Sequence, residues 1–244
     1  MRYLVLFLLL TFNVMAFDNG RYLFSTWGYM HSINSVMAVN STSGDIVHSA
    51  EWESKAFEDS PYYTIRIENW QDNNVSGIEW VHHKIYLKNN PSTIEDFSVS
   101  DGYNMLFYNV GKRKDGIIRK WGAGIVVAHP DVTLTGRDRF WNDGGISGAY
   151  FAGFAVQHSI ETWFYETSHH LLSLEGKITA AYARIPISDD DSEYADVPNI
   201  AFHITLGLGS KPLPKKPKPI DYANYFGVPI LHHYSIYQFS KLTD

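Results

Sequence analysis

The sequence predicts an all-β fold, an antiparallel transmembrane β-barrel of eight strands or, alternatively, ten, and two observations support this. From Asn199 to Gly209, apolar residues alternate with small or polar ones, and in an extended strand alternate side chains point to opposite faces. Similar stretches recur along the chain, separated in turn by long and short loops. Because bacterial outer-membrane barrels combine an even number of antiparallel strands with short periplasmic turns and long outer loops, this rhythm predicts such a barrel.

The expected strands cover residues 22–32, 62–70, 77–87, 103–112, 120–129, 150–161, 171–185 and 199–209. Residues 46–55 are expected to form a hairpin arm in the first outer loop. If they span the membrane instead, the count becomes nine, or ten with a tail strand at residues 230–239. A long polar loop at residues 131–148 and an acidic loop at residues 189–191 are placed on the outer side.

Strand parity alone leaves open which face points inward. In residues 171–185, Leu174 and Ile178 lie opposite Glu175 and Lys177. A soluble barrel of the lipocalin kind would hide the leucines inside, whereas a membrane barrel turns them to lipid. An N-terminal secretion signal and Tyr and Trp near the strand ends favour the membrane, because amphipathic rings suit its interfaces. The lumen is then expected to be filled, without a water-filled pore, and its charges to pair with one another. The residues expected in this network are Arg66, Glu68, Glu175, Lys177 and His203.

The two ends of the chain have their own signatures. Residues 1–16 resemble a cleaved signal peptide, with Arg2, an apolar run and a small-residue cleavage site. Residues 17–210 are assigned to the barrel and residues 211–244 to a Pro/Lys-rich linker and an aromatic periplasmic tail. The net charge of −6 argues against nucleic-acid binding, and the lack of cysteine excludes disulfides and thiolate sites. The expected location is the bacterial outer membrane, and the expected partners are its lipid and the outer-membrane assembly machinery.

Several short segments together resemble a family of proteobacterial outer-membrane barrels known as lipid A oxidases. They are residues 51–57, 60–63, 80–86, 100–104, 122–124 with 129–131, and 175–177. The resemblance extends over the barrel region, and the chain departs from it in its tail, in Asp131 where the family has Glu, and in lacking an aromatic residue at the end of the last strand. The resemblance implies an oxygen-dependent oxidoreductase that converts the proximal glucosamine of lipid A to aminogluconate. It supplies no established catalytic residues.

Candidate site residues come from the outer ends of the expected strands. Phosphate binding calls for cations, and sugar chemistry calls for a general base or a metal. Imidazole and carboxylate also suit a divalent transition metal, whose ligands stay unknown. The catalytic candidates are His82, Glu53 and His129, and the substrate-binding candidates are Lys84, Arg137, Arg184 and Tyr86. Alternatively, His82 fills the barrel mouth and His129 belongs to a turn, and the protein is a non-enzymatic structural or adhesive barrel.

Overall fold

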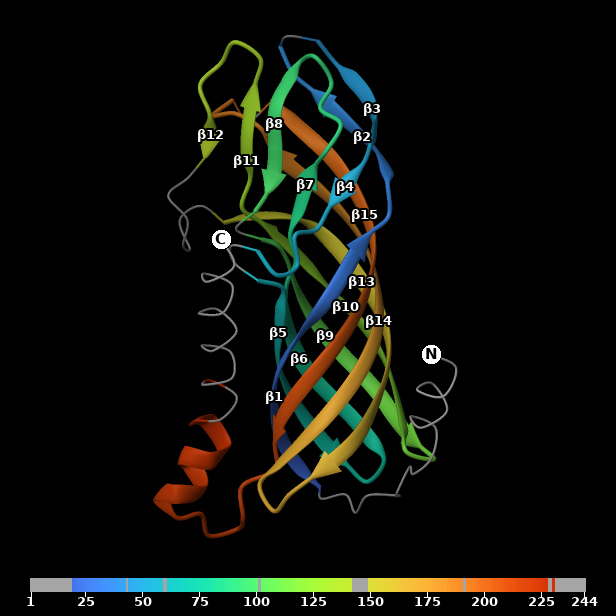
Figure 1. The fold of residues 1–244 in the computed structure, drawn as a ribbon, viewed down its shortest axis with the longest axis vertical. Helices are drawn as coiled ribbons and strands as arrows, with labels where there is room; N and C mark the ends of the chain where they lie inside the picture. Colours follow the sequence, from blue (N-terminus) through green and yellow to red (C-terminus); the bar gives the residue numbers. More distant parts are fainter. Residues whose placement is uncertain are drawn as a thin grey trace, which may run out of the picture.

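The structure is a computed structural model that describes residues 19–42, 44–58, 61–100, 102–141, 149–190, 192–227 and 230. Its main element is a closed antiparallel barrel in which each strand pairs with the next and β15 pairs back with β1 (Figure 1). The barrel strands are β1 (Gly20–Ser32), β5 (Tyr63–Gln71), β6 (Asn74–His82), β9 (Tyr103–Lys114), β10 (Ile117–Ala128), β13 (Tyr150–Glu166), β14 (His170–Pro186) and β15 (Tyr194–Ser210). The predicted eight-stranded barrel is confirmed. The expected signal peptide and the strand at residues 230–239 fall largely outside the described residues.

Short turns gather at one end of the barrel, together with the start of β1 and the end of β15. The turn between β9 and β10 is Asp115-Gly116, whose φ angles of 51° and 79° match a two-residue hairpin turn that favours Asp-Gly. Only two residues also separate β5 from β6. Because outer-membrane barrels place their short turns on the periplasmic side, this end is the periplasmic end, and the opposite end is the outer end.

The outer end carries further strands. β2 (Ser35–Asn40) pairs with β15, and β3 (Ile46–Ala50) pairs with β2, so the expected hairpin arm is confirmed. A separate five-stranded sheet, the outer sheet, has the order β12-β11-β8-β7-β4. Its strands are β4 (Trp52–Glu53), β7 (Ile85–Leu87), β8 (Ile94–Val99), β11 (Asp131–Leu134) and β12 (Phe140–Trp141). Two expectations need correction: residues 77–87 form two strands in different sheets, and the polar loop begins with β11 and β12.

The outward face of the barrel is apolar. Ile67 on β5, Ile78 on β6 and Ile204 on β15 are 48%, 57% and 63% exposed, while their neighbours Arg66, Glu79 and His203 are buried. A water-soluble barrel has the opposite arrangement. The prediction that apolar residues face lipid is therefore confirmed, and the lipocalin-like alternative is wrong.

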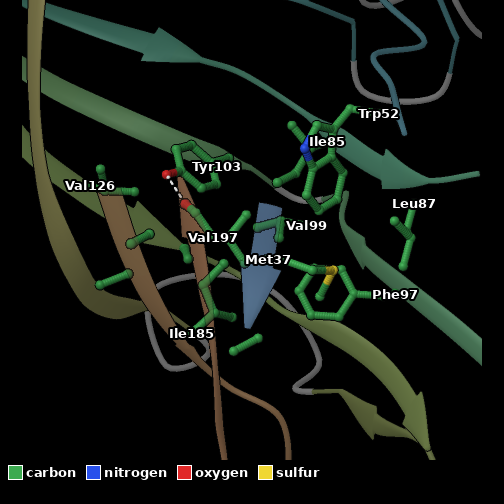
Figure 2. Close-up of a cluster of buried hydrophobic side chains, with 14 of the residues drawn as sticks. Met37, Trp52, Ile85, Leu87, Phe97, Val99, Tyr103, Val126, Ile185 and Val197 are labelled. Atoms are coloured by element: carbon green, nitrogen blue, oxygen red, sulfur yellow. Dashed lines mark hydrogen bonds between the residues drawn. The ribbon is translucent and has the colours of Figure 1, made fainter. Parts of the chain in front are cut away.

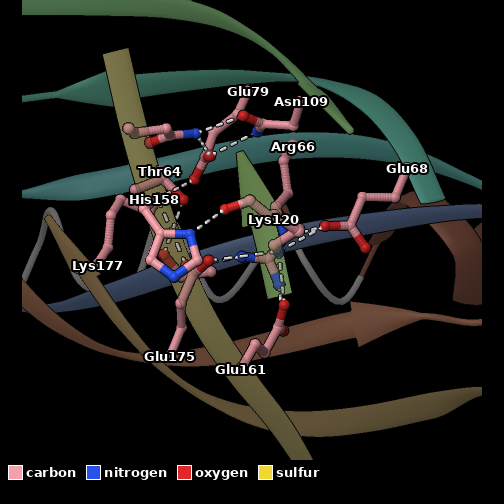
Figure 3. A network of polar contacts seen from close by, with 12 residues as sticks. Thr64, Arg66, Glu68, Glu79, Asn109, Lys120, His158, Glu161, Glu175 and Lys177 are labelled. Carbon is pink, nitrogen blue, oxygen red and sulfur yellow. Dashed lines mark hydrogen bonds and ion pairs between the residues drawn. The ribbon is translucent and has the colours of Figure 1, made fainter. Parts of the chain in front are cut away.

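The middle of the barrel holds an ionic layer (Figure 3). The Arg66 guanidinium contacts Glu161, lies 3.0 Å from a Glu68 oxygen and 2.9 Å from a Glu175 oxygen. Lys120 Nζ lies 2.8 Å from a Glu68 oxygen, 2.6 Å from a Glu161 oxygen and 3.3 Å from a Glu175 oxygen. Lys177 contacts Glu79 and lies 3.4 Å from Glu175, and the amides of Asn109 and Gln157 donate to Glu79 over 2.9 and 2.7 Å. The predicted ion-pair network is present. His203 lies opposite Lys177 in the β14–β15 pair, and its ring hydrogen-bonds Thr179 over 2.9 Å.

Apolar layers lie at both ends of the ionic layer. On the periplasmic side, Tyr22, Trp70 and Trp163 pack with ring centroids 5.3 and 5.4 Å apart. On the outer side, the inner face of the outer sheet packs against the upper barrel in a large apolar cluster, the outer core (Figure 2). There Phe97 and Val99 are fully buried, and the Tyr103 hydroxyl donates to the Val197 carbonyl over 3.0 Å. The lumen is thus filled layer by layer.

Beyond β15, residues 211–218 run without helix or strand and residues 219–227 form a helix, the tail helix. In the part of the chain that the structure describes, no helix combines the length and hydropathy needed to cross a membrane.

Candidate functional site

A group of polar and aromatic side chains lies where the outer ends of β5, β6 and β9 meet the outer sheet. We call it the rim cluster, and its members are Lys55, Tyr63, His82, Lys84, Tyr86 and Asn104. Strand parity places part of it on the lipid side of the wall: His82 follows Ile78 and Trp80 at period two, and Tyr63 precedes Ile65. His82 therefore does not fill the barrel mouth, because its side chain belongs to the outward face.

His82 is held by its neighbours on both adjoining strands. Tyr63 lies opposite it on β5, and the two rings stack with centroids 4.8 Å apart. On the other side, His82 Nδ1 lies 2.8 Å from Asn104 Oδ1. An amide oxygen only accepts, so in this arrangement Nδ1 carries the proton and Nε2 is the basic nitrogen. The side chain is 6% exposed, so its orientation is fixed by packing.

The adjacent His83 points into the barrel instead. Its Nδ1 lies 2.8 Å from Met30 Sδ and its Nε2 lies 3.2 Å from Ser32 Oγ. Burial, and secondarily the neighbouring His82, lowers the pKa of His83 to about 3. His83 is therefore a neutral packing residue, and of the two histidines only His82 belongs to the outward-facing cluster.

Above His82, two lysines flank Tyr86 on the outer sheet. Lys55 Nζ lies 4.5 Å from the centre of the Tyr86 ring and Lys84 Nζ lies 5.6 Å from it. Both distances fall within the range of cation–π contact. Lys84 is fully buried and donates to the Glu58 carbonyl over 2.6 Å. The aromatic ring thus keeps two positive charges close together at the level where the barrel wall ends.

Strand pairing continues this polar surface across the outer sheet. Tyr86 lies opposite Ser98, Ser98 opposite Asp131, and Asp131 opposite Trp141. The Arg139 guanidinium forms an ion pair with Asp131, in which Nε lies 2.6 Å from Oδ1. The opposite face of this sheet faces the outer core, so these polar groups point away from it.

Segments that are distant in sequence converge on the rim cluster. The Tyr62 amide donates to the Ala56 carbonyl over 2.9 Å, the Tyr103 amide to the His83 carbonyl over 2.6 Å, and the His129 amide to the Gly102 carbonyl over 3.1 Å. These bonds link residues 51–57 with 60–63, residues 80–86 with 100–104, and residues 100–104 with 129–131, which are segments that carry the family resemblance.

The candidates named from sequence divide into two sets. His82, Lys84 and Tyr86 lie in the rim cluster, and Glu53 is an exposed residue directly opposite Tyr86 in the β4–β7 pair. His129 is half-buried just beyond β10, tied to Gly102 through its backbone.

The two arginines lie elsewhere. Arg137 pairs with Glu193 over 2.6 Å and with the Thr42 hydroxyl over 2.7 Å, and Arg184 pairs with Asp196 over 2.9 and 3.1 Å. Each of these guanidiniums is already engaged in an outer-loop or strand-end ion pair. Lys55, Tyr63 and Asn104 belong to the rim cluster but were not among the candidates named from sequence. The alternation of Trp80 and His82 is the sequence signal that could have indicated them, because it places His82 on the outward face of the barrel wall.

A metal centre has no support in the described parts of the chain. Among those residues there is no group of three or more His, Asp or Glu that could hold a metal ion. These residue types suit proton transfer at His82 and binding of an anionic group by Lys55, whereas Lys84 is buried and already donates to the Glu58 carbonyl.

Comparison with known proteins adds three solved barrels. No protein-family model matches the chain, and no curated protein sequence matches it. Among solved structures, the outer membrane protein AlkL in DMPC bilayers has a TM-score of 0.49 at 10% identity, covering 84% of this chain and 97% of AlkL. OprG from Pseudomonas aeruginosa has a TM-score of 0.41 at 10% identity, covering 78% and 96%. Neisserial surface protein A has a TM-score of 0.38 at 11% identity, covering 79% and 97%.

The class of the protein follows from its own surface. A closed even-numbered antiparallel barrel, an apolar outward belt, a buried ionic interior and short turns at one end are the features of an outer-membrane barrel. The chain is an outer-membrane β-barrel, and its location is the bacterial outer membrane.

Proposed function

We propose that the protein binds and modifies lipid headgroups of the outer leaflet, with lipid A as the substrate class. The supporting observation is the place of the rim cluster. His82 and Tyr63 continue the lipid-facing rows of β6 and β5, at the point where aliphatic residues give way to polar ones. A lipid beside the barrel would present its headgroup at this level, without leaving the membrane.

The charges of the rim cluster suit an anionic headgroup. Lys55 Nζ lies 4.5 Å from the centre of the Tyr86 ring, and the buried Lys84 adds a second positive charge 5.6 Å from it. Charge-assisted hydrogen bonds from ammonium groups to phosphate are among the stronger polar contacts. The Glu53 carboxylate nearby would favour a sugar hydroxyl over a phosphate. Together these groups favour a phosphorylated sugar over a neutral ligand.

His82 is the best candidate for a general base. Asn104 and Tyr63 fix the ring, and the Asn104 contact leaves Nε2 as the nitrogen that can take a proton. The reaction implied by the family resemblance is oxidation of the proximal glucosamine at C1. It removes two electrons and two protons from the sugar, and oxygen accepts them to give hydrogen peroxide. We assign to His82 only the removal of the hydroxyl proton, because the described residues do not fit a metal and no redox step can be derived from them.

Mass spectrometry of lipid A tests this proposal. Cells that express the protein are expected to contain a lipid A species that cells without it lack. The variant His82→Gln is expected to abolish this species, whereas His31→Gln, which changes an exposed histidine on the outward face of β1, is expected to retain it. Unchanged lipid A in expressing cells would overturn the proposal. Full modification by His82→Gln would remove His82 from the mechanism.

A second candidate function is supported by the outer sheet. Its inner face is buried in the outer core, which includes Phe97, Val99 and Val132. Such a sheet fits a structural or adhesive surface protein. Unchanged lipid A combined with tight binding of cells to an immobilised surface or host protein would favour this function.

A further inference from the structure

The tail helix presents an apolar face that nothing in the described chain covers. Tyr222 and Phe226 are 47% and 48% exposed. Residues spaced three or four apart lie on one side of a helix, and the exposed positions 219, 222, 223 and 226 follow this spacing without a single charge. In water such a face would be unfavourable.

Contacts with the barrel hold the opposite face of the tail helix in place. The Tyr225 hydroxyl donates to the Arg21 carbonyl over 3.0 Å, and the Asn224 carbonyl lies 3.0 Å from His170 Nε2 and 3.3 Å from Ser210 Oγ. Gly20 allows the linker to approach: its φ is 141°, and a Cβ at this position would lie 2.7 Å from Pro212. The tail helix therefore lies beside the periplasmic end of the barrel (Figure 1).

Between the tail and the barrel wall lies a cavity of about 420 Å³. Its lining joins the outward residues Leu23 and Ile67 of the barrel to Leu213 and Phe226 of the tail, with Arg21 and Asn69 among the polar residues. Ile67 belongs to the lipid-facing belt, so the cavity is continuous with the surface that contacts the membrane. Its volume falls within the usual range of small-molecule pockets.

Positive charge accompanies this apolar surface. Lys215, Lys216 and Lys218 are exposed in the linker just before the tail helix, and Arg21 is exposed at the cavity without an ion pair to any described residue. Helices that lie in a membrane interface combine an apolar face with neighbouring Lys or Arg that attract anionic headgroups.

We propose that the tail helix lies in the periplasmic leaflet and, with the barrel wall, forms a binding site for an anionic glycerophospholipid. One acyl chain enters the cavity beside Leu23 and Ile67, and the headgroup phosphate meets Arg21 and the linker lysines. This site is on the opposite side of the membrane from the rim cluster, and it does not depend on the proposed function.

Spin labels test the position of the helix. Because the chain contains no cysteine, Ala223→Cys, or Tyr222→Cys as a second variant, introduces one unique labelling position on the exposed face. In liposomes of phosphatidylcholine and phosphatidylglycerol, the label at 223 is expected to be relaxed by oxygen more than by a water-soluble nickel chelate. Val156→Cys in the lipid-facing belt and Asn73→Cys in a periplasmic turn give the lipid and water references. Accessibility equal to that of Asn73→Cys at both helix positions would overturn the proposal.

Native mass spectrometry of the full chain in detergent tests the lipid site with phosphatidylglycerol as the probe. Arg21→Gln is expected to reduce the retained phosphatidylglycerol several-fold, whereas Arg119→Gln, an exposed arginine on β10, is expected to leave it unchanged. Equal retention by the two variants would overturn the assignment of Arg21 to the headgroup.

Discussion

The ionic layer of the barrel and the outer core are two buried interiors of one chain with opposite chemistry. Arg66, Glu161 and Lys177 fill the first, and Phe97 and Val99 fill the second. The difference follows from what surrounds each part. Where the outside is hydrocarbon, apolar side chains turn outward and polar ones are left to fill the lumen. Where the outside is water, the hydrophobic effect collects apolar side chains inside.

Breaking the ionic layer is expected to have the largest effect. Arg66→Met removes the guanidinium that contacts Glu68, Glu161 and Glu175. Of the remaining cations in the layer, Lys120 contacts all three carboxylates and Lys177 contacts only Glu175 among them. Loss of one partner from a buried ion pair typically costs about 3–5 kcal/mol. Urea unfolding in liposomes should show a loss of this size. The exposed Arg119→Met serves as a control, and adding Glu161→Gln to Arg66→Met should recover part of the stability.

Placing a charged side chain on the outward face of the barrel is expected to lower the free energy of unfolding by a somewhat smaller amount. Ile204 lies near the middle of β15 and is 63% exposed to lipid. Arginine at the bilayer midplane on the lipid face of a barrel costs about 2–4 kcal/mol. Ile204→Arg should therefore lower the free energy of unfolding in liposomes by up to this amount, since the cost decreases from the midplane toward the interfaces. An Ile204→Arg protein as stable as the wild type would contradict the assignment of this face to lipid.

A conservative change in the outer core is expected to have a modest effect. Ile85 on β7 is fully buried in this core, and removing one buried methylene as Ile→Val typically costs about 0.5–1.5 kcal/mol. Ile85→Val should increase hydrogen exchange of the amides in the outer sheet. The amides of β14 and β15 that lie below the outer ends of these strands should stay protected. Equal loss of protection in the barrel would show that the two interiors unfold as one unit.

The smallest expected effect on stability concerns the ion pair between Arg137 and Glu193 in the outer loops. Hydrogen bonds from Arg137, Ser188 and Thr42 lower the pKa of Glu193 from its ordinary value of 4.5 to about 2. The stabilisation is complete above pH 4.5 and is lost as the pH falls toward 2, because the protonated carboxyl no longer pairs with Arg137. The protection of the Thr42 amide, which donates to Glu193 over 2.7 Å, should decrease over this range when its exchange rate is compared with the intrinsic rate at each pH. Glu193→Gln should show no such pH dependence.

Much of the barrel was predictable because period-two alternation is a local property. The alternation in β14 and β15 places Leu174 and Phe202 on one face, and Glu175 and His203 on the other. Short turns such as Asp115-Gly116 are local as well. The outer sheet was missed because β4, β11 and β12 span only two to four residues. Strands of this length carry little periodicity. They form because their pairing in the outer sheet buries the apolar side chains of the outer core.

The rim cluster was predictable only in part. His82, Lys84 and Tyr86 were found because they recur at period two within one segment. Asn104 and Lys55 approach them from other segments, through strand pairing between β6 and β9 and through the left-handed backbone of Lys55, whose φ is 40°. Arg137 and Arg184 were placed with them because they are cations near outer strand ends. The sequence does not predict that each arginine already forms an ion pair with a carboxylate of another segment.

The sequence by itself determined that alternating strands close into an antiparallel barrel, since side-chain parity and turn chemistry act over a few residues. Only the tertiary structure decided that His82 lies on the outward side of β6, that Lys55 and Lys84 both lie near Tyr86, and that the tail helix contacts the periplasmic end of the barrel. These arrangements depend on contacts between segments far apart in the chain, whose geometry is set by the closure and register of the whole sheet.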